Sequence, residues 1–62
     1  MKNRSTTAQL AALAALSHTH KAPVQRDTTE RGTGDILCHL YPPNRASALM
    51  FRVARSGQVT AV

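Results

Sequence analysis

The second half of the chain alternates apolar and polar residues with a period of two. In each of the segments 36–41 and 49–54, every second residue is apolar, beginning with the first. Such alternation is typical of a β-strand with one buried face, because successive side chains of a strand point to opposite sides. The intervening Pro42-Pro43-Asn44-Arg45 favours a break between strands. We therefore predict an antiparallel hairpin with strands at about 35–41 and 47–55.

The residues after this hairpin indicate a third strand. Ser56-Gly57 is a typical turn sequence, and residues 58–62 are long enough for one short strand. The resulting meander would have one apolar face and a second face that is only half apolar. The predicted apolar face carries Ile36, Cys38, Leu40, Leu49, Phe51 and Val53, and the other carries Leu37, His39, Tyr41, Met50, Arg52 and Ala54.

The first half of the chain contains a helical pattern, which we predict over residues 6–18. Thr6 and Gln9 have the spacing of a capping box, in which each residue's side chain bonds the other's backbone N–H. The segment that follows is rich in alanine, the residue with the highest helix propensity. Pro23 prevents the helix from continuing much further. One row of side chains is expected to face the sheet: Leu10, Leu13 and Leu16.

The remaining segments are polar. Residues 1–5 are predicted to form a flexible arm, and residues 19–34 a loop rich in Thr, Arg, Asp, Glu and Gly. The predicted fold class is therefore α+β, with one N-terminal helix packed on a three-stranded antiparallel β-meander. At 62 residues the chain forms one small domain, near the lower limit at which a hydrophobic core suffices for folding.

The charge and the half-apolar sheet face favour a binding function. The formal net charge is +5, which suits an acidic protein or a polyanion as partner, although a charge of this size also serves solubility alone. We predict a non-enzymatic protein that modulates or inhibits a protein partner. Its size alone would suit an accessory protein of a phage or plasmid. The expected contact residues are His39, Tyr41, Arg45, Met50, Arg52 and Arg55.

Nucleic-acid binding is the alternative function. Arg45, Arg52 and Arg55 would converge on the hairpin and could contact phosphates. Single-strand binders usually add stacking aromatic residues to such a groove. Here the aromatic residues are Tyr41 and Phe51, and Phe51 is predicted to be buried. The sequence contains no helix-turn-helix, zinc-finger or ribonucleoprotein motif.

The sequence does not favour a metal site, a cofactor or catalysis. His18, His20, Cys38 and His39 are residues of metal-ligand type, but Cys38 and His39 would point to opposite faces of a strand. For the same reason His39 could not activate Cys38 as a nucleophile. The chain has three acidic side chains in all, so few pairs of residues could act as general acid and base.

The single cysteine excludes an internal disulfide and favours a reducing compartment, so we predict a cytoplasmic protein. Residues 1–4 and the apolar stretch after them resemble a signal peptide, but that stretch is short and we interpret it as a helix of the mature protein. It is too short to span a bilayer, and no membrane partner is expected. We predict a homo-oligomer, most simply a dimer, because the core is small and the edge strand 58–62 lacks proline and lysine.

Overall fold

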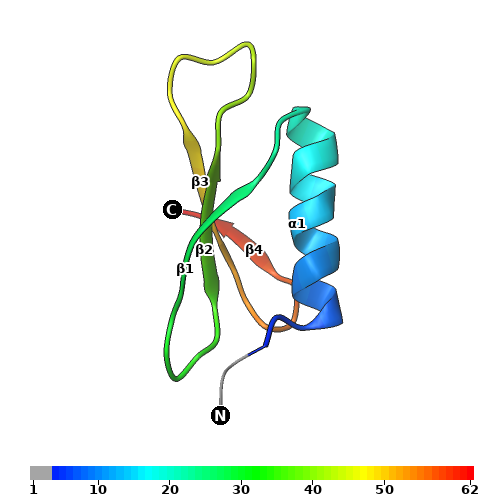
Figure 1. Cartoon of the computed structure of the whole chain (residues 1–62), viewed down its shortest axis with the longest axis vertical. Coiled ribbons are helices and arrows are strands. Elements are labelled where there is room, and N and C mark those ends of the chain that lie inside the picture. Colours follow the sequence, from blue (N-terminus) through cyan, green and yellow to red (C-terminus); the bar gives the residue numbers. More distant parts are fainter. Residues whose placement is uncertain (1–3) are drawn as a thin grey trace.

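The computed structural model describes residues 4–62, which fold into one helix packed on one antiparallel sheet (Figure 1). The elements are α1 (Thr7–His20), β1 (Gln25–Thr29), β2 (Ile36–Leu40), β3 (Leu49–Val53) and β4 (Val59–Ala61). The order of the strands in the sheet is β1-β2-β3-β4, and α1 lies along one face of it. The predicted α+β class is confirmed. The predicted strands correspond to β2, β3 and β4, each slightly shorter than expected, and residues 1–3 of the predicted arm lie outside the described part.

The prediction of a loop over residues 19–34 is wrong for β1. All five side chains of β1 are exposed and polar, so the strand carries no hydrophobic pattern that a sequence reading could detect. Its strand conformation comes from pairing with β2, in which Gln25 lies opposite His39 and Thr29 opposite Ile36. The register shifts at Asp27, which forms a β-bulge.

Helix α1 begins and ends at residues that satisfy its free backbone groups. The Gln9 N–H donates to Thr6 Oγ1 (3.0 Å) and the Thr6 N–H donates to Gln9 Oε1 (2.9 Å), which confirms the predicted capping box. At the other end Lys21 adopts a left-handed conformation with φ 54°, and Pro23 follows. The helix extends to His20, two residues beyond the predicted end, because Pro23 constrains only the residue before it.

The core lies between α1 and the centre of the sheet. Ile36, Cys38 and Val53 are buried together, with Ile36 directly opposite Val53 in the β2–β3 register. The helix contributes Leu13 and Leu16, as predicted, together with the smaller Ala12. The expectation for Leu10 is wrong, because its side chain is 49% exposed. A row of residues spaced by three drifts around a helix, and the inward position of the first turn is taken by Gln9 instead.

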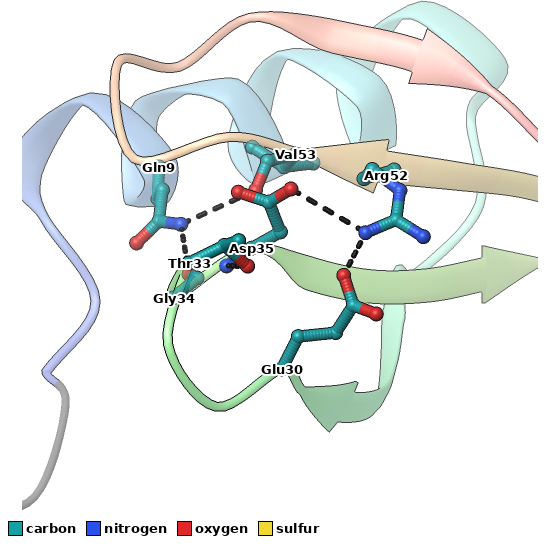
Figure 2. Close-up of polar contacts among 7 residues, drawn as sticks. All are labelled: Gln9, Glu30, Thr33, Gly34, Asp35, Arg52 and Val53. Atoms are coloured by element: carbon teal, nitrogen blue, oxygen red, sulfur yellow. Dashed lines mark hydrogen bonds and ion pairs between the residues drawn. The ribbon is translucent and has the colours of Figure 1, made fainter.

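The buried Gln9 side chain joins the helix to two other segments (Figure 2). It is 1% exposed, and its Nε2 donates to the backbone carbonyls of Gly34 (2.8 Å) and Val53 (3.2 Å). The same helical turn lies against the β3–β4 turn, where a Cβ on Gly57 would approach the Ala8 Cβ to 3.1 Å. Gly57 has φ +92°, so glycine serves both the turn and the close approach. These contacts set the helix on one face and leave the opposite face uncovered.

Candidate functional site

The face of the sheet opposite α1, here called the open face, brings together four of the six predicted contact residues, His39, Tyr41, Met50 and Arg52, with Leu37 beside them. Leu37 pairs with Arg52 and His39 pairs with Met50, so these four side chains lie side by side. Tyr41 follows His39 by two residues, so the two side chains point to the same face. Tyr41 is 61% exposed and Met50 is 49% exposed. The open face therefore presents large apolar groups to solvent near the β2–β3 loop.

His39 is held in a defined orientation on the open face. Its Nδ1 lies 2.5 Å from Asp27 Oδ1, and its ring meets the Tyr41 ring edge-to-face with centroids 5.4 Å apart. A carboxylate only accepts hydrogen bonds, so Nδ1–H is the donor in this pair. In the neutral ring Nε2 is then the acceptor nitrogen. Asp27 reaches His39 from the β-bulge in β1, the strand that the sequence did not reveal.

Arg52 is also held by carboxylates (Figure 2). Its Nη1 donates to Glu30 and lies 3.4 Å from Asp35 Oδ2. Asp27, Glu30 and Asp35 are the three acidic residues of the chain; Asp27 contacts His39, and Glu30 and Asp35 contact Arg52. The positive charge of Arg52 is consequently compensated, and the open face combines exposed apolar side chains with a paired arginine.

The two other predicted arginines lie away from this centre. Arg45 is in the loop that joins β2 to β3, and Arg55 is in the turn that joins β3 to β4. These connections lie at opposite ends of β3, so the arginines of the hairpin are separated rather than gathered (Figure 1). The structure brings together His39, Tyr41, Met50 and Arg52, and places Arg45 and Arg55 beyond either end.

Three basic residues belong to segments that meet at the end of the sheet carrying Arg55. The Arg55 Nη1 donates to the Arg4 carbonyl (3.4 Å), and the Arg55 side chain lies against Gly34 of the β1–β2 turn. Arg31 belongs to that same turn, and all three arginines are exposed. We call Arg4, Arg31 and Arg55 the basic end. Sequence reasoning missed it because its members are far apart in the chain and share no motif.

The residues of metal-ligand type do not converge. Cys38 is in the core with its Sγ 3.7 Å from the Phe51 carbonyl, and His39 is on the open face. His20 packs on the helix side, with its ring 5.8 Å from the Phe51 ring. Within residues 4–62 no three histidine, cysteine, aspartate or glutamate side chains lie close enough to hold a metal ion.

The Cys38 thiol is expected to react with thiol reagents only when the chain opens. Burial raises the pKa of Cys38, and the negative charge of Asp27 raises it further, so little reactive thiolate forms near neutral pH. An opening free energy of about 3 kcal/mol would slow labelling by roughly 100-fold relative to the unfolded chain. Labelling by a disulfide reagent at pH 8, with and without denaturant, measures this ratio. Equal rates in the two conditions would contradict the burial of Cys38.

Comparisons of this chain with protein families, with curated proteins and with solved structures find no match. No helix formed by residues 4–62 is both long and apolar enough to cross a membrane.

Proposed function

We propose that this protein is a small, basic, non-enzymatic binding protein that modulates or inhibits a protein partner through the open face. The observation that carries the proposal is the exposure of Tyr41 and Met50 beside the held side chains of His39 and Arg52. Tyrosine, methionine and arginine are enriched in protein interfaces relative to other surfaces. Their ordered arrangement lowers the entropy lost on binding, because His39 and Arg52 already have defined orientations.

The compensated charges favour a protein partner over a polyanion at this face. Arg52 is paired with Glu30 and Asp35, so a phosphate would have to compete with two carboxylates. A protein surface can instead cover the exposed Tyr41 and Met50 side chains and leave those ion pairs at its margin. Arg45 and Arg55 would contact acidic groups at the two ends of the same interface. The proposal requires no cofactor, and with one buried cysteine it suits the reducing cytoplasm.

Nucleic-acid binding is the competing function, and the basic end is the observation that favours it. Arg4, Arg31 and Arg55 could contact phosphates there, whereas Arg45 lies at the other end of β3 and Arg52 is held by Glu30 and Asp35. Salt distinguishes the two functions, because phosphate contacts release counterions and weaken steeply as the salt concentration rises. Absence of a shift with mixed-sequence DNA and RNA at low salt would remove this competitor.

Replacing both Tyr41 and Met50 by alanine is expected to weaken partner capture at least tenfold, which corresponds to about 1.4 kcal/mol or more. A few aromatic and apolar side chains often dominate the binding energy of an interface. The immobilised chain would be incubated with nuclease-treated extract of its host, and captured proteins quantified. Leu10→Ala is the matched control, because Leu10 is exposed to the same 49% as Met50 but lies on the helix. Equal capture by the double variant and the unmodified chain would contradict the proposal.

We also propose that the functional unit is a homodimer. The buried apolar residues of the described chain are few: Ala22, Ile36, Cys38, Leu40 and Val53. A domain of this size gains stability from any surface that it buries against a second copy. Twofold symmetry is the commonest arrangement for such an assembly.

A further inference from the structure

We propose that the dimer forms by antiparallel pairing of β4 with β4 of a second copy, which joins two four-stranded sheets into one continuous sheet. This inference rests on the proposed homodimer and assigns its interface. The strand β4 is an outer strand of the sheet and pairs on one side only, with β3. Its other side is the surface on which a second copy would add.

The hydrogen bonds between β3 and β4 show which backbone groups of β4 point inward. The Ala54 N–H donates to the Gln58 carbonyl (2.9 Å), and the Val62 N–H donates to the Met50 carbonyl (3.0 Å). Hydrogen-bonded and non-hydrogen-bonded pairs alternate along an antiparallel ladder. Residues 58, 60 and 62 therefore turn their backbone groups toward β3.

Val59 and Ala61 consequently turn their N–H and C=O groups away from β3. They occupy the non-hydrogen-bonded positions, opposite Val53 and Phe51 respectively. The free edge of β4 thus offers two donors and two acceptors in strand geometry. An edge of this kind is a template for an added strand.

One register satisfies all four of these groups in a symmetric pair. If Val59 of each copy lies opposite Ala61 of the other, each pair forms two hydrogen bonds and the dimer gains four. Placing Val59 opposite Val59, or Ala61 opposite Ala61, would form only one such pair. In the favoured register Thr60 lies opposite Thr60 of the second copy, on the twofold axis.

Of the two outer strands, β1 carries features that discourage pairing with a second copy and β4 does not. In β1, a β-bulge interrupts the edge at Asp27, Arg26 adds a charge, and Pro23 lies just before the strand. Bulges, charges and prolines are the usual devices that prevent edge-to-edge association. Val59, Thr60 and Ala61 carry no charge, and no register shift interrupts their pairing with β3. The edge of β4 is therefore the better candidate.

Edge pairing also suits the side chains on both faces. Val59 and Ala61 lie on the same face as Val53 and Phe51, the face that packs against α1. Edge pairing would therefore join the apolar faces of the two sheets into one continuous face. Stacking two open faces would instead bring Arg52 and its carboxylates near their own symmetry mates. The twofold axis of an antiparallel pair is perpendicular to the sheet, so edge pairing leaves both open faces uncovered on the same side. The dimer would then offer its partner two adjacent copies of the open face.

Sedimentation of the full chain at micromolar concentration, followed by a lysine substitution at the axis, tests the interface. We expect a mass of twice 6.7 kDa for the unmodified chain. Thr60→Lys should raise the dimer dissociation constant at least tenfold, because it places like charges directly opposite each other. Thr28→Lys is the matched control, since Thr28 is an exposed threonine on the other outer strand and should leave the mass unchanged.

Cysteine cross-linking then reads the register. Under oxidised glutathione, Thr60→Cys should form a disulfide-linked dimer, because residues in a non-hydrogen-bonded pair have Cα atoms about 4.5 Å apart, within disulfide reach. Val62→Cys should not, since the two copies of residue 62 would be separated by roughly 14 Å along the strands. The native Cys38 is buried and should not interfere.

Three other results would overturn the inference, and each would reject a different part of it. A dimer that Thr60→Lys leaves intact would place the interface elsewhere while preserving the proposed homodimer. Cross-linking through residue 62 rather than residue 60 would reject the register. A folded monomer of 6.7 kDa would overturn both the interface and the homodimer. None of these results depends on partner capture, which tests the open face separately.

Discussion

Replacing Gln9 by leucine is expected to remove most of the stability of the folded chain. Its amide donates to the carbonyls of Gly34 and Val53 and accepts from the Thr6 N–H. Leucine would leave the two carbonyls without their side-chain donor in a buried site, at about 1–3 kcal/mol each. The total, roughly 2–6 kcal/mol, is large for a chain whose expected stability is only about 3–9 kcal/mol, at about 0.05–0.15 kcal/mol per residue.

Urea denaturation followed by circular dichroism would measure this loss. Gln25→Leu is the matched control, because Gln25 is exposed in β1, and its replacement should change the free energy of unfolding by less than about 0.5 kcal/mol. Similar midpoints for the two variants would show that the buried amide is not a structural link.

The variant Gln9→Glu adds a pH dependence to the same prediction. A carboxylate at this position would face two carbonyl oxygens in a buried site, so the folded chain would favour the protonated form. The pKa of the introduced carboxyl would then lie above its unfolded value of about 4.3. Relative to the unmodified chain, this variant should be most stable below about pH 4 and lose stability as the pH rises through the folded pKa. A difference that does not change with pH would contradict the assigned contacts.

Replacing Ile36 by alanine is expected to destabilise the chain by about 2–5 kcal/mol, because it removes a fully buried side chain and leaves a cavity. Ile36 lies directly opposite Val53 and shares the core with Leu13 and Leu16 of α1. A shift of the urea midpoint to the lowest concentrations, with loss of both helix and strand signals, is the expected result.

Leu10→Ala serves as the control for this loss of apolar volume. Leu10 is largely exposed, and alanine has the higher helix propensity, so its replacement should cost less than about 1 kcal/mol. If the two substitutions had equal effects, the core would not be centred on β2 and β3 as the structure places it.

Local patterns along the chain were enough to predict part of the open face. Alternation within β2 and β3 places His39, Tyr41, Met50 and Arg52 on one side of the sheet, because the period of a strand requires it. The same patterns could not show that Asp27, Glu30 and Asp35 pair with these residues. Nor could they separate Arg45 from Arg55, whose positions depend on where the hairpin begins and ends.

The sequence by itself determined the elements whose signals lie within a few residues: the capped helix α1 and the alternating strands β2 and β3. Only the tertiary structure decided the rest. The strand β1 is polar throughout and exists because it pairs with the edge of β2. Gln9 is recognisable as a capping residue, but its second pair of hydrogen bonds joins it to residues 25 and 44 positions away. Such contacts depend on register and packing across the whole fold, and a local pattern carries no record of them.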